Sequence, residues 1–252
     1  MIVGNGKPNG RITPCEQCPL RERSCLRDFT PDELAFVREF KIDELHVEPG
    51  ASFLREGARS EHLYTVLHGW AFRYKMLDDG RRQILNFALP ADMIGLQGAL
   101  MHEMEHSVEA LTPLTLCVFP RAKMYELYAN FPSLAFDVTW LAAREEQLID
   151  EHLLSIGRRT ALERTAFLLL HLFARAGEVG MTKNGVLTFP FTQQHLADAL
   201  GMSLVHTNKT LKRLLASGAI RWQGRVFEVL DRAQLARQAG GEVTVRKARP
   251  FI

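Results

Sequence analysis

The pattern of apolar and polar positions changes twice along the chain and divides it into three regions. Between residues 31 and 130, short runs of β-branched and aromatic residues alternate with single glycines. Two of these runs, 63–77 and 81–89, flank an Asp-Asp-Gly sequence at 78–80, which is a hairpin signal. Short strands at this spacing predict a small antiparallel roll or barrel.

A helical period replaces this pattern after Pro132. Apolar residues at spacings of three, four and seven form two neighbouring stripes: Leu134, Val138, Leu141 and Leu148 in one, and Ile149, Leu153 and Ile156 in the other. They predict a helix of about 24 residues and about 36 Å that ends at Gly157. Because this exceeds what a small domain needs, we expect part of the helix to face a second copy of the chain; the alternative is a helix lying across its own domain. The candidate interface residues are Val138, Leu141, Glu145, Leu148, Ile149, His152 and Ile156.

The third region, residues 160–232, alternates helices with short strands. Residues 192–218 predict two helices around Gly201-Met202-Ser203, with Gly201 making the tight turn and Ser203 capping the second helix. This is the helix-turn-helix arrangement, whose second helix fits the major groove of DNA. Residues 219–230 then predict a two-stranded wing with a turn at Gln223-Gly224. The candidate DNA-contacting residues are Ser203, Val205, His206, Asn208, Lys209, Lys212, Arg213, Arg221 and Arg225.

Charge is distributed in a way that supports this interpretation. Met181 to Ile252 contains eleven Lys or Arg and four Asp or Glu, whereas residues 1–180 contain 20 and 25, and the whole chain carries only +2. A basic C-terminal third therefore indicates that one end of the molecule meets a polyanion.

Four cysteines form the second candidate site: Cys15, Cys18, Cys25 and Cys117. The first residues are polar and contain no apolar leader, and no run approaches eighteen apolar residues, so we expect a cytoplasmic protein without a membrane span. Thiols stay reduced in the cytoplasm, so metal binding or redox chemistry explains the cysteines better than a disulfide.

A roll, a long helix and a winged helix-turn-helix in this order resemble the CRP/FNR superfamily of bacterial transcription regulators. The resemblance covers residues 15–240 and implies an α+β fold in five segments. They are an N-terminal cysteine-bearing segment (1–30), a β-roll sensor domain (31–132), a dimerisation helix (133–157), a winged helix-turn-helix DNA-binding domain (158–240) and a tail (241–252). It also implies a homodimer on a palindromic double-stranded DNA site, contact with RNA polymerase, and a protein that is not an enzyme.

The cysteines resemble those of the FNR branch, which carries an oxygen-labile [4Fe–4S] cluster on three N-terminal cysteines and one in the roll. This implies Cys15, Cys18, Cys25 and Cys117 as ligands and oxygen or nitric oxide as the signal. The gap before Cys25 is one residue longer than in the best-known FNR proteins. Zinc on the same thiolates, and thiols that are inert or redox-switched, are the alternatives. A regulator whose roll senses haem or another small molecule also remains open.

Two familiar site patterns of the family are altered. Cyclic-AMP-binding members use Gly-Glu-Leu and then Arg-Ser; here Leu96 or Gln97 replaces the glutamate and His106-Ser107 replaces Arg-Ser, so no cyclic AMP is expected. In the recognition helix, Val205 and Lys209 stand where the family has Glu and Arg. The resemblance therefore implies a half-site other than TTGAT or TGTGA.

One further motif points to an enzyme. Residues 102–106, His-Glu-Met-Glu-His, match the H-E-x-x-H pattern of zinc-dependent hydrolases. Those enzymes need both histidines on one face of a long helix, whereas this stretch is predicted as a loop or short helix between strands. We therefore interpret it as a chance match.

Overall fold

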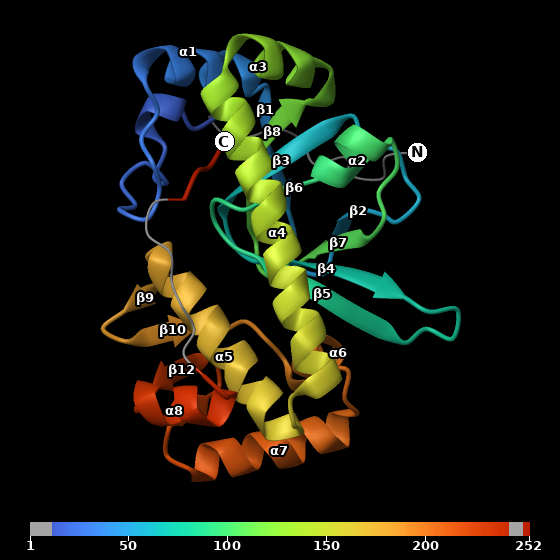
Figure 1. The fold of residues 1–252 in the computed structure, drawn as a ribbon, viewed down its shortest axis with the longest axis vertical. Helices are drawn as coiled ribbons and strands as arrows, with labels where there is room; N and C mark the ends of the chain where they lie inside the picture. Colours follow the sequence, from blue (N-terminus) through green and yellow to red (C-terminus); the bar gives the residue numbers. More distant parts are fainter. Residues whose placement is uncertain (1–11, 242–248) are drawn as a thin grey trace. The chain divides into compact units, whose positions relative to one another are not determined.

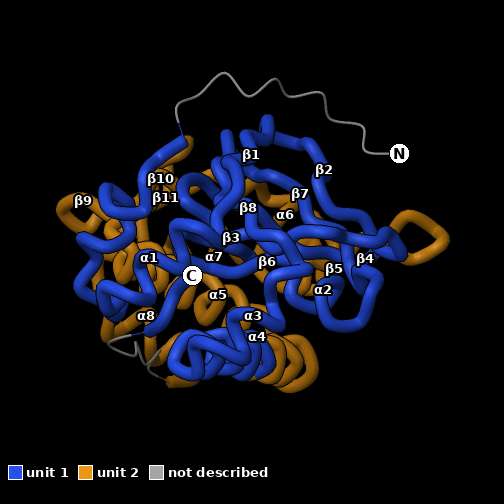
Figure 2. Tube along the Cα trace, turned by 90° about the horizontal axis from the view of Figure 1, so that it is seen from above, with its two compact units in different colours: residues 1–75, 87–146, 247–252 blue, residues 76–86, 147–246 orange. Residues whose placement is uncertain are grey.

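The computed structural model describes residues 12–241 and 249–252. The chain forms two compact units. Unit 1 comprises Met1–Lys75, Phe87–Glu146 and Lys247–Ile252, and unit 2 comprises Met76–Asn86 and Gln147–Arg246. Figure 1 shows the elements and Figure 2 colours the two units.

The predicted roll is confirmed as two four-stranded antiparallel sheets. One has the order β1-β8-β3-β6 and the other β2-β7-β4-β5. The strands are β1 (Asp43–Val47), β2 (Ser52–Leu54), β3 (His62–His68), β4 (Ala71–Met76), β5 (Arg82–Ala88), β6 (Met93–Ile94), β7 (Ser107–Ala110) and β8 (Leu114–Pro120). A core that includes Val66, Val108 and Leu116, each with no exposed surface, lies inside unit 1. The β4–β5 hairpin turns at residues 78–80, as predicted.

Three short helices interrupt the region that was predicted to be mostly strands. They are α1 (Pro31–Phe40), α2 (Leu96–Met101) and α3 (Met124–Asn130), and two 3-10 turns, η1 (Cys15–Gln17) and η2 (Arg121–Lys123), accompany them. α1 begins with a capping box, because the Thr30 hydroxyl accepts from the Glu33 N–H while the Glu33 carboxylate accepts from the Thr30 N–H.

The predicted long helix is α4 (Pro132–Arg158), 27 residues long. It begins one residue before the predicted start, and Gly157 lies inside its last turn instead of ending it.

Unit 2 has a helical core with a small sheet. Its elements are α5 (Ala161–Glu178), β9 (Thr182–Lys183), β10 (Val186–Thr188), α6 (Gln193–Leu200), α7 (Leu204–Ala216), β11 (Ile220–Gln223), β12 (Val226–Val229) and α8 (Arg232–Ala239). The sheet order is β11-β12-β10-β9. Leu169, Leu196, Leu214, Phe227 and Leu235 are fully buried, so the amphipathic faces of these helices meet in one core.

Four of the residues predicted as a tail at 241–252 are described by the structure. Arg249–Ile252 belong to unit 1, where Arg249 forms an isolated parallel bridge with Leu26. In Figure 1 this stretch lies beside the N-terminal segment. Its side chains are buried, so it is part of the folded roll.

Among the helices of the described residues, none has the length and apolar character needed to cross a membrane.

Candidate DNA-binding helix and cysteine cavity

The turn between α6 and α7 has the geometry that its residues predict. Gly201 ends α6 in the left-handed conformation, with φ of 60°, which a residue without Cβ adopts readily. Ser203 then caps α7, because its hydroxyl accepts from the His206 N–H at 3.2 Å. These two residues set the direction in which α7 leaves the turn.

The two faces of α7 differ in burial. Thr207, Thr210, Leu211 and Leu214 are buried in unit 2. The opposite face is exposed and carries Val205, His206, Lys209, Lys212 and Arg213. Val205 is 80% exposed, so its methyl groups are open to a ligand. The outer face of α7 therefore offers basic groups and one apolar contact to a ligand.

Asn208 is placed differently from its predicted neighbours. It is half-buried, and its Oδ1 atom is enclosed and accepts no hydrogen bond from the described residues. Bidentate pairing with adenine needs both amide atoms, so Asn208 does not present that pair in this conformation.

The wing formed by β11 and β12 follows α7. Its turn is tied by the Trp222 Nε1–H, which donates to the Gly224 carbonyl at 3.1 Å. Arg225 is exposed at the tip. Arg221 is exposed but pairs with Glu228 at 2.9 Å, and such a surface pair is weak enough to be exchanged for a phosphate.

Three of the four cysteines share one cavity in unit 1. Cys15 and Cys18 come from η1 and the residue that follows it, and Cys117 comes from β8. The cavity has a volume of about 30 Å³, and Lys41, Phe251 and Ile252 line it beside the thiols. Lys41 Nζ donates to Glu44 at 2.7 Å and to the Thr13 carbonyl at 2.8 Å, so this cation is held at the cavity by the chain itself.

The thiols of this cavity are protonated near neutral pH. Burial raises the pKa of Cys15 and of Cys18, and it raises the pKa of Cys117 to about 12, although Lys41 opposes each shift. Metal binding therefore requires that the thiols lose protons as the metal enters.

In the described conformation, three of the four cysteines that the resemblance implies as cluster ligands line the cavity. Cys25 is buried but does not line the cavity. A volume near 30 Å³ has room for about two water molecules, whereas a cubane has eight iron and sulfur atoms. Among the described residues, no group of three or more His, Cys, Asp or Glu side chains is arranged to hold a metal ion.

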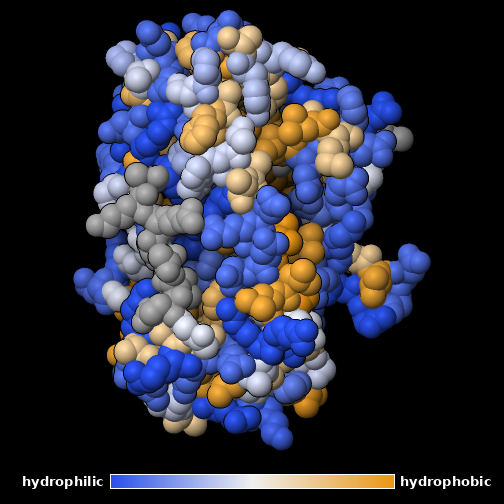
Figure 3. All heavy atoms as spheres, in the orientation of Figure 1, coloured by the Kyte–Doolittle hydropathy of each residue, from blue (hydrophilic) through white to orange (hydrophobic). Residues whose placement is uncertain are grey.

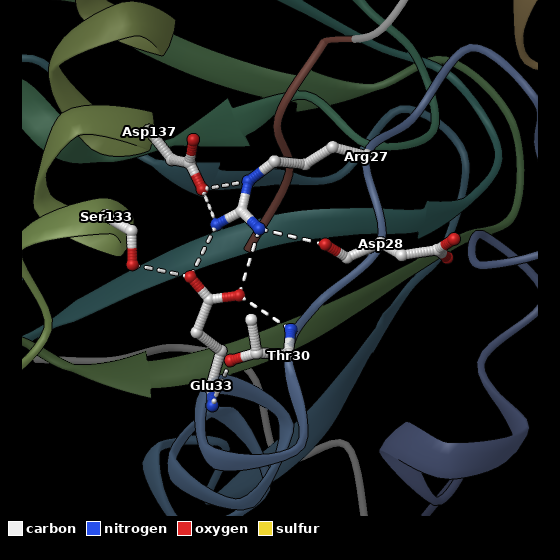
Figure 4. Close-up of polar contacts among 6 residues, drawn as sticks. All are labelled: Arg27, Asp28, Thr30, Glu33, Ser133 and Asp137. Atoms are coloured by element: carbon white, nitrogen blue, oxygen red, sulfur yellow. Dashed lines mark hydrogen bonds and ion pairs between the residues drawn. The ribbon is translucent and has the colours of Figure 1, made fainter.

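An ion-pair network lies just after Cys25, and no motif in the sequence predicts it. Figure 4 shows the Arg27 guanidinium between Glu33 of α1 and Asp137 of α4. Arg27 pairs with Glu33 at 2.9 Å and with Asp137, and Ser133 of α4 donates to Glu33 at 2.6 Å. The Thr-x-x-Glu capping signal at residues 30–33 was visible in the sequence; the long-range partner, Asp137, had no local signal.

Burial and pairing act against each other in this network. Burial alone would raise the pKa of Glu33, but the hydrogen bonds from Arg27 and Ser133 lower that pKa to about 2. Glu33 is therefore ionised at neutral pH and holds the guanidinium close to α4.

The candidate interface residues of α4 fall into two groups. Val138 and Leu141 are buried within a single chain, so they belong to its own core and not to a surface open to a partner. Glu145 pairs with Arg73 of β4, and His152 lies 3.3 Å from the Gln83 amide, while Leu148 and Ile156 are half-buried.

The exposed apolar face of α4 is made mostly by other residues. Phe136, Ile149, Leu153 and Leu154 are exposed, and Phe136 and Leu153 are 68% and 62% exposed. Figure 3 shows apolar atoms at the surface along this helix. Of the predicted set, only Ile149 belongs to this open face.

Residues 102–106 do not form a zinc-hydrolase site. His102 follows α2 with φ of 75°, outside any helix, and its Nδ1 lies 2.6 Å from the Arg121 guanidinium. His106 is buried, and burial lowers its pKa to about 4. The two histidines are thus not neighbours on one helical face, which confirms the interpretation as a chance match.

Two family models match the chain. Residues 44–131 match the cyclic nucleotide-binding domain, and residues 163–238 match the Crp-like helix-turn-helix domain. The first covers most of the roll, and the second covers α6, α7 and the wing.

Known proteins are similar over nearly the whole length. The nitrogen fixation regulation protein FixK of Bradyrhizobium diazoefficiens is 31% identical over 235 residues, which is 91% of this chain and 94% of FixK. The transcriptional activator protein FnrL of Cereibacter sphaeroides is 29% identical, over 90% of this chain and 92% of its own. The solved structure of FixK2 from Bradyrhizobium japonicum aligns with a TM-score of 0.71 at 25% identity, covering 80% of this chain and 98% of FixK2.

Proposed function

Because the chain belongs to the CRP/FNR family of transcription regulators, which bind DNA and are not enzymes, we propose that it binds a palindromic DNA site as a homodimer under control of its cysteine-bearing N-terminal segment. The observation that carries this proposal is the outer face of α7, which is exposed and basic on a helix capped directly after the Gly201 turn.

The two faces of α7 suggest how DNA is read. Lys209, Lys212 and Arg213 supply phosphate or guanine contacts from the exposed side, while the buried side keeps the helix fixed on unit 2. Val205 can contact a thymine methyl group but cannot accept a hydrogen bond from cytosine. Arg225 extends the basic surface onto the wing. FnrL is named a transcriptional activator, and by that likeness we extend the proposal to contact with RNA polymerase.

The DNA-binding proposal is tested by selection from random DNA followed by titration. We expect a palindrome whose half-site is neither TTGAT nor TGTGA. Lys209→Ala and Lys212→Ala should weaken binding and lower the salt dependence, by roughly one counterion for each phosphate that is no longer neutralised. Lys75→Ala, an exposed lysine of β4 in the roll, is the matched control and should change neither quantity. Recovery of either standard half-site, or equal effects of all three variants, would contradict this assignment.

The sensing proposal follows from the position of Arg27. This residue comes two positions after Cys25 and is held by Glu33 and by Asp137 of α4. A change of conformation or charge at the cysteines therefore acts on the residue that ties their segment to the long helix. Because α4 carries exposed apolar residues, the signal would act by altering how this helix packs.

An oxygen- or nitric-oxide-sensitive [4Fe–4S] cluster is one form of this sensor. The shared cavity of Cys15, Cys18 and Cys117 favours it, because thiolates are the ligands of such clusters. The observed arrangement would have to change first: Cys25 would have to join the other thiols, and the cavity would have to expand. A switch through the oxidation state of the thiols needs less rearrangement and is the alternative.

Anaerobic purification distinguishes these forms. Iron and sulfide in equal amounts, absent from Cys25→Ser, would establish the cluster with Cys25 as a ligand. One zinc per chain would establish a thiolate zinc site. A metal-free protein whose DNA affinity changes reversibly with a disulfide reductant would establish the thiol switch. DNA binding that is the same in wild type and Cys117→Ser under all these conditions would contradict control by the cysteines.

A further inference from the structure

The C-terminal residues Arg249–Ile252 are among the best buried parts of unit 1. Arg249, Phe251 and Ile252 are 5%, 4% and 3% exposed. Their closest partners lie far away in the sequence, in the cysteine-bearing segment and in the roll. Such burial of a short apolar segment indicates a built binding surface.

The surface pairs the backbone of Arg249 with the cysteine-bearing segment through an isolated parallel bridge. The Arg249 N–H donates to the Cys25 carbonyl at 2.7 Å, and the Arg27 N–H donates to the Arg249 carbonyl at 3.0 Å. The segment is thereby paired with the stretch that connects Cys25 to the Arg27 network.

The surface also selects the side chain of Arg249. Its guanidinium pairs with Asp92 at 2.9 Å and donates to the Pro90 carbonyl at 3.3 Å. Asp92 is itself only 5% exposed. Because a buried carboxylate is strongly unfavourable without a partner, this groove is complementary to a segment that brings a positive charge.

Phe251 and Ile252 line the thiol cavity. The Phe251 ring lies 4.9 Å from that of Phe29, and the Ile252 carbonyl accepts from the Thr65 hydroxyl. Both residues line the cavity together with Cys15, Cys18 and Cys117.

We propose that Arg249–Ile252 is an intrachain ligand of the roll that covers Cys117 at the thiol cavity, so that reagents and metal ions reach this buried thiol only when the segment is released. The proposal uses the cavity of the proposed sensor but does not depend on what the thiols bind. Residues 249–252 thus act as a cover. The ion pair of Arg249 with Asp92 anchors the segment, and Phe251 and Ile252 pack at the cavity.

The test is the rate of alkylation by iodoacetamide, followed for each cysteine by mass spectrometry of the full-length protein and its variants. In a variant that ends at Arg246, and in Arg249→Ala, we expect Cys117 to react at least about tenfold faster than in wild type, because reaction then needs no release step. Arg59→Ala, which removes an arginine that is 82% exposed, is the matched control and should react like wild type.

A peptide of residues 247–252 added to the shortened variant should restore slow alkylation of Cys117. The same peptide with glutamate in place of Arg249 should not, since it would place a second negative charge beside Asp92. Circular dichroism identifies variants that have lost the fold. In a folded variant, slow alkylation restored by the peptide shows that fast alkylation came from the missing segment. Equal Cys117 rates in wild type and in folded variants, or protection by both peptides alike, would overturn the proposal. Because alkylation needs only access of the reagent to the Cys117 thiolate and no bound metal, a negative result for the cluster would leave this result intact.

Discussion

Arg27 brings three segments of unit 1 together at the scale of a single side chain. It follows the cysteines, contacts α1 through Glu33 and contacts α4 through Asp137. Two carboxylates around one guanidinium leave the cluster with excess negative charge, which Ser133 partly balances by donating to Glu33. Each group is stable where it lies only because the others are present, so the network acts as a unit.

The charge of Glu33 can be tested without losing its role as a helix cap, because glutamine also completes a capping box. The pKa of Glu33 is lowered to about 2, so its stabilisation is present above the unfolded pKa near 4.3 and is lost as the pH falls towards 2. We expect Glu33→Gln to lower the free energy of unfolding by roughly 2 kcal/mol at pH 7, with the difference from wild type shrinking between about pH 4.5 and pH 2. Urea unfolding at a series of pH values measures this.

Asp32→Asn is the matched control for that experiment. Asp32 is exposed in the same first turn of α1, so its loss removes only a helix-dipole interaction of about 0.5 kcal/mol. A gap between Glu33→Gln and wild type that persists at pH 2 would show that the amide disturbs packing and that the charge is not the cause.

Helices and strands with a regular apolar spacing can be predicted from the sequence, whereas elements that depart from that spacing cannot. The strands, α4 and the pair α6–α7 follow from apolar spacing and from Gly201 and Ser203. α1 was missed because its ten residues lie in a region of strand-like composition, although its capping box was visible. The apolar spacing in α4 predicts a helix. It does not show which of the apolar residues are buried within their own chain, as Val138 and Leu141 are.

Two glycines at helix ends should respond in opposite ways to alanine. Gly201 has φ of 60°, so Gly201→Ala should cost about 1 kcal/mol. Gly157 lies within α4 and an added Cβ would meet open space, so Gly157→Ala should stabilise the protein by roughly 0.5 to 1 kcal/mol. Thermal unfolding of both variants checks the sign; a gain at Gly201 or a loss at Gly157 would contradict these backbone assignments.

At the scale of the whole molecule, the open face of α4 has no cover within the described chain. Two copies that join through this face would bury Ile149 and Leu153 and would present two α7 helices to one DNA site.

A charge on this face should separate the copies. We expect Leu153→Arg to shift the protein from dimer to monomer in analytical ultracentrifugation and to weaken binding to the palindromic site by at least about tenfold, since only one half-site is then held by each chain. Met76→Arg changes a side chain of similar exposure on β4 and should leave both quantities unchanged. A dimer that persists in Leu153→Arg would move the interface elsewhere.

The candidate sites were predictable to the extent that they are local. α7, its cap and its basic face lie in one continuous stretch, so the sequence places them together. Cys15, Cys18 and Cys117 were grouped through a resemblance, and the structure brings these three into one cavity. The position of Cys25 outside this cavity depends on contacts between segments that are distant in the sequence. The same holds for Phe251 and Ile252 in the cavity lining, and such contacts leave no periodic signal in the sequence.

The return of the chain to unit 1 sets the order in which a newly made molecule can be finished. Asp92 meets Arg249 across 157 residues, and Thr65 meets Ile252 across 187. A domain usually folds as its residues leave the ribosome, but unit 1 receives residues 249–252 only after unit 2 has been synthesised. A nascent chain therefore passes through a stage in which α7 is already made while residues 249–252 do not yet cover Cys117.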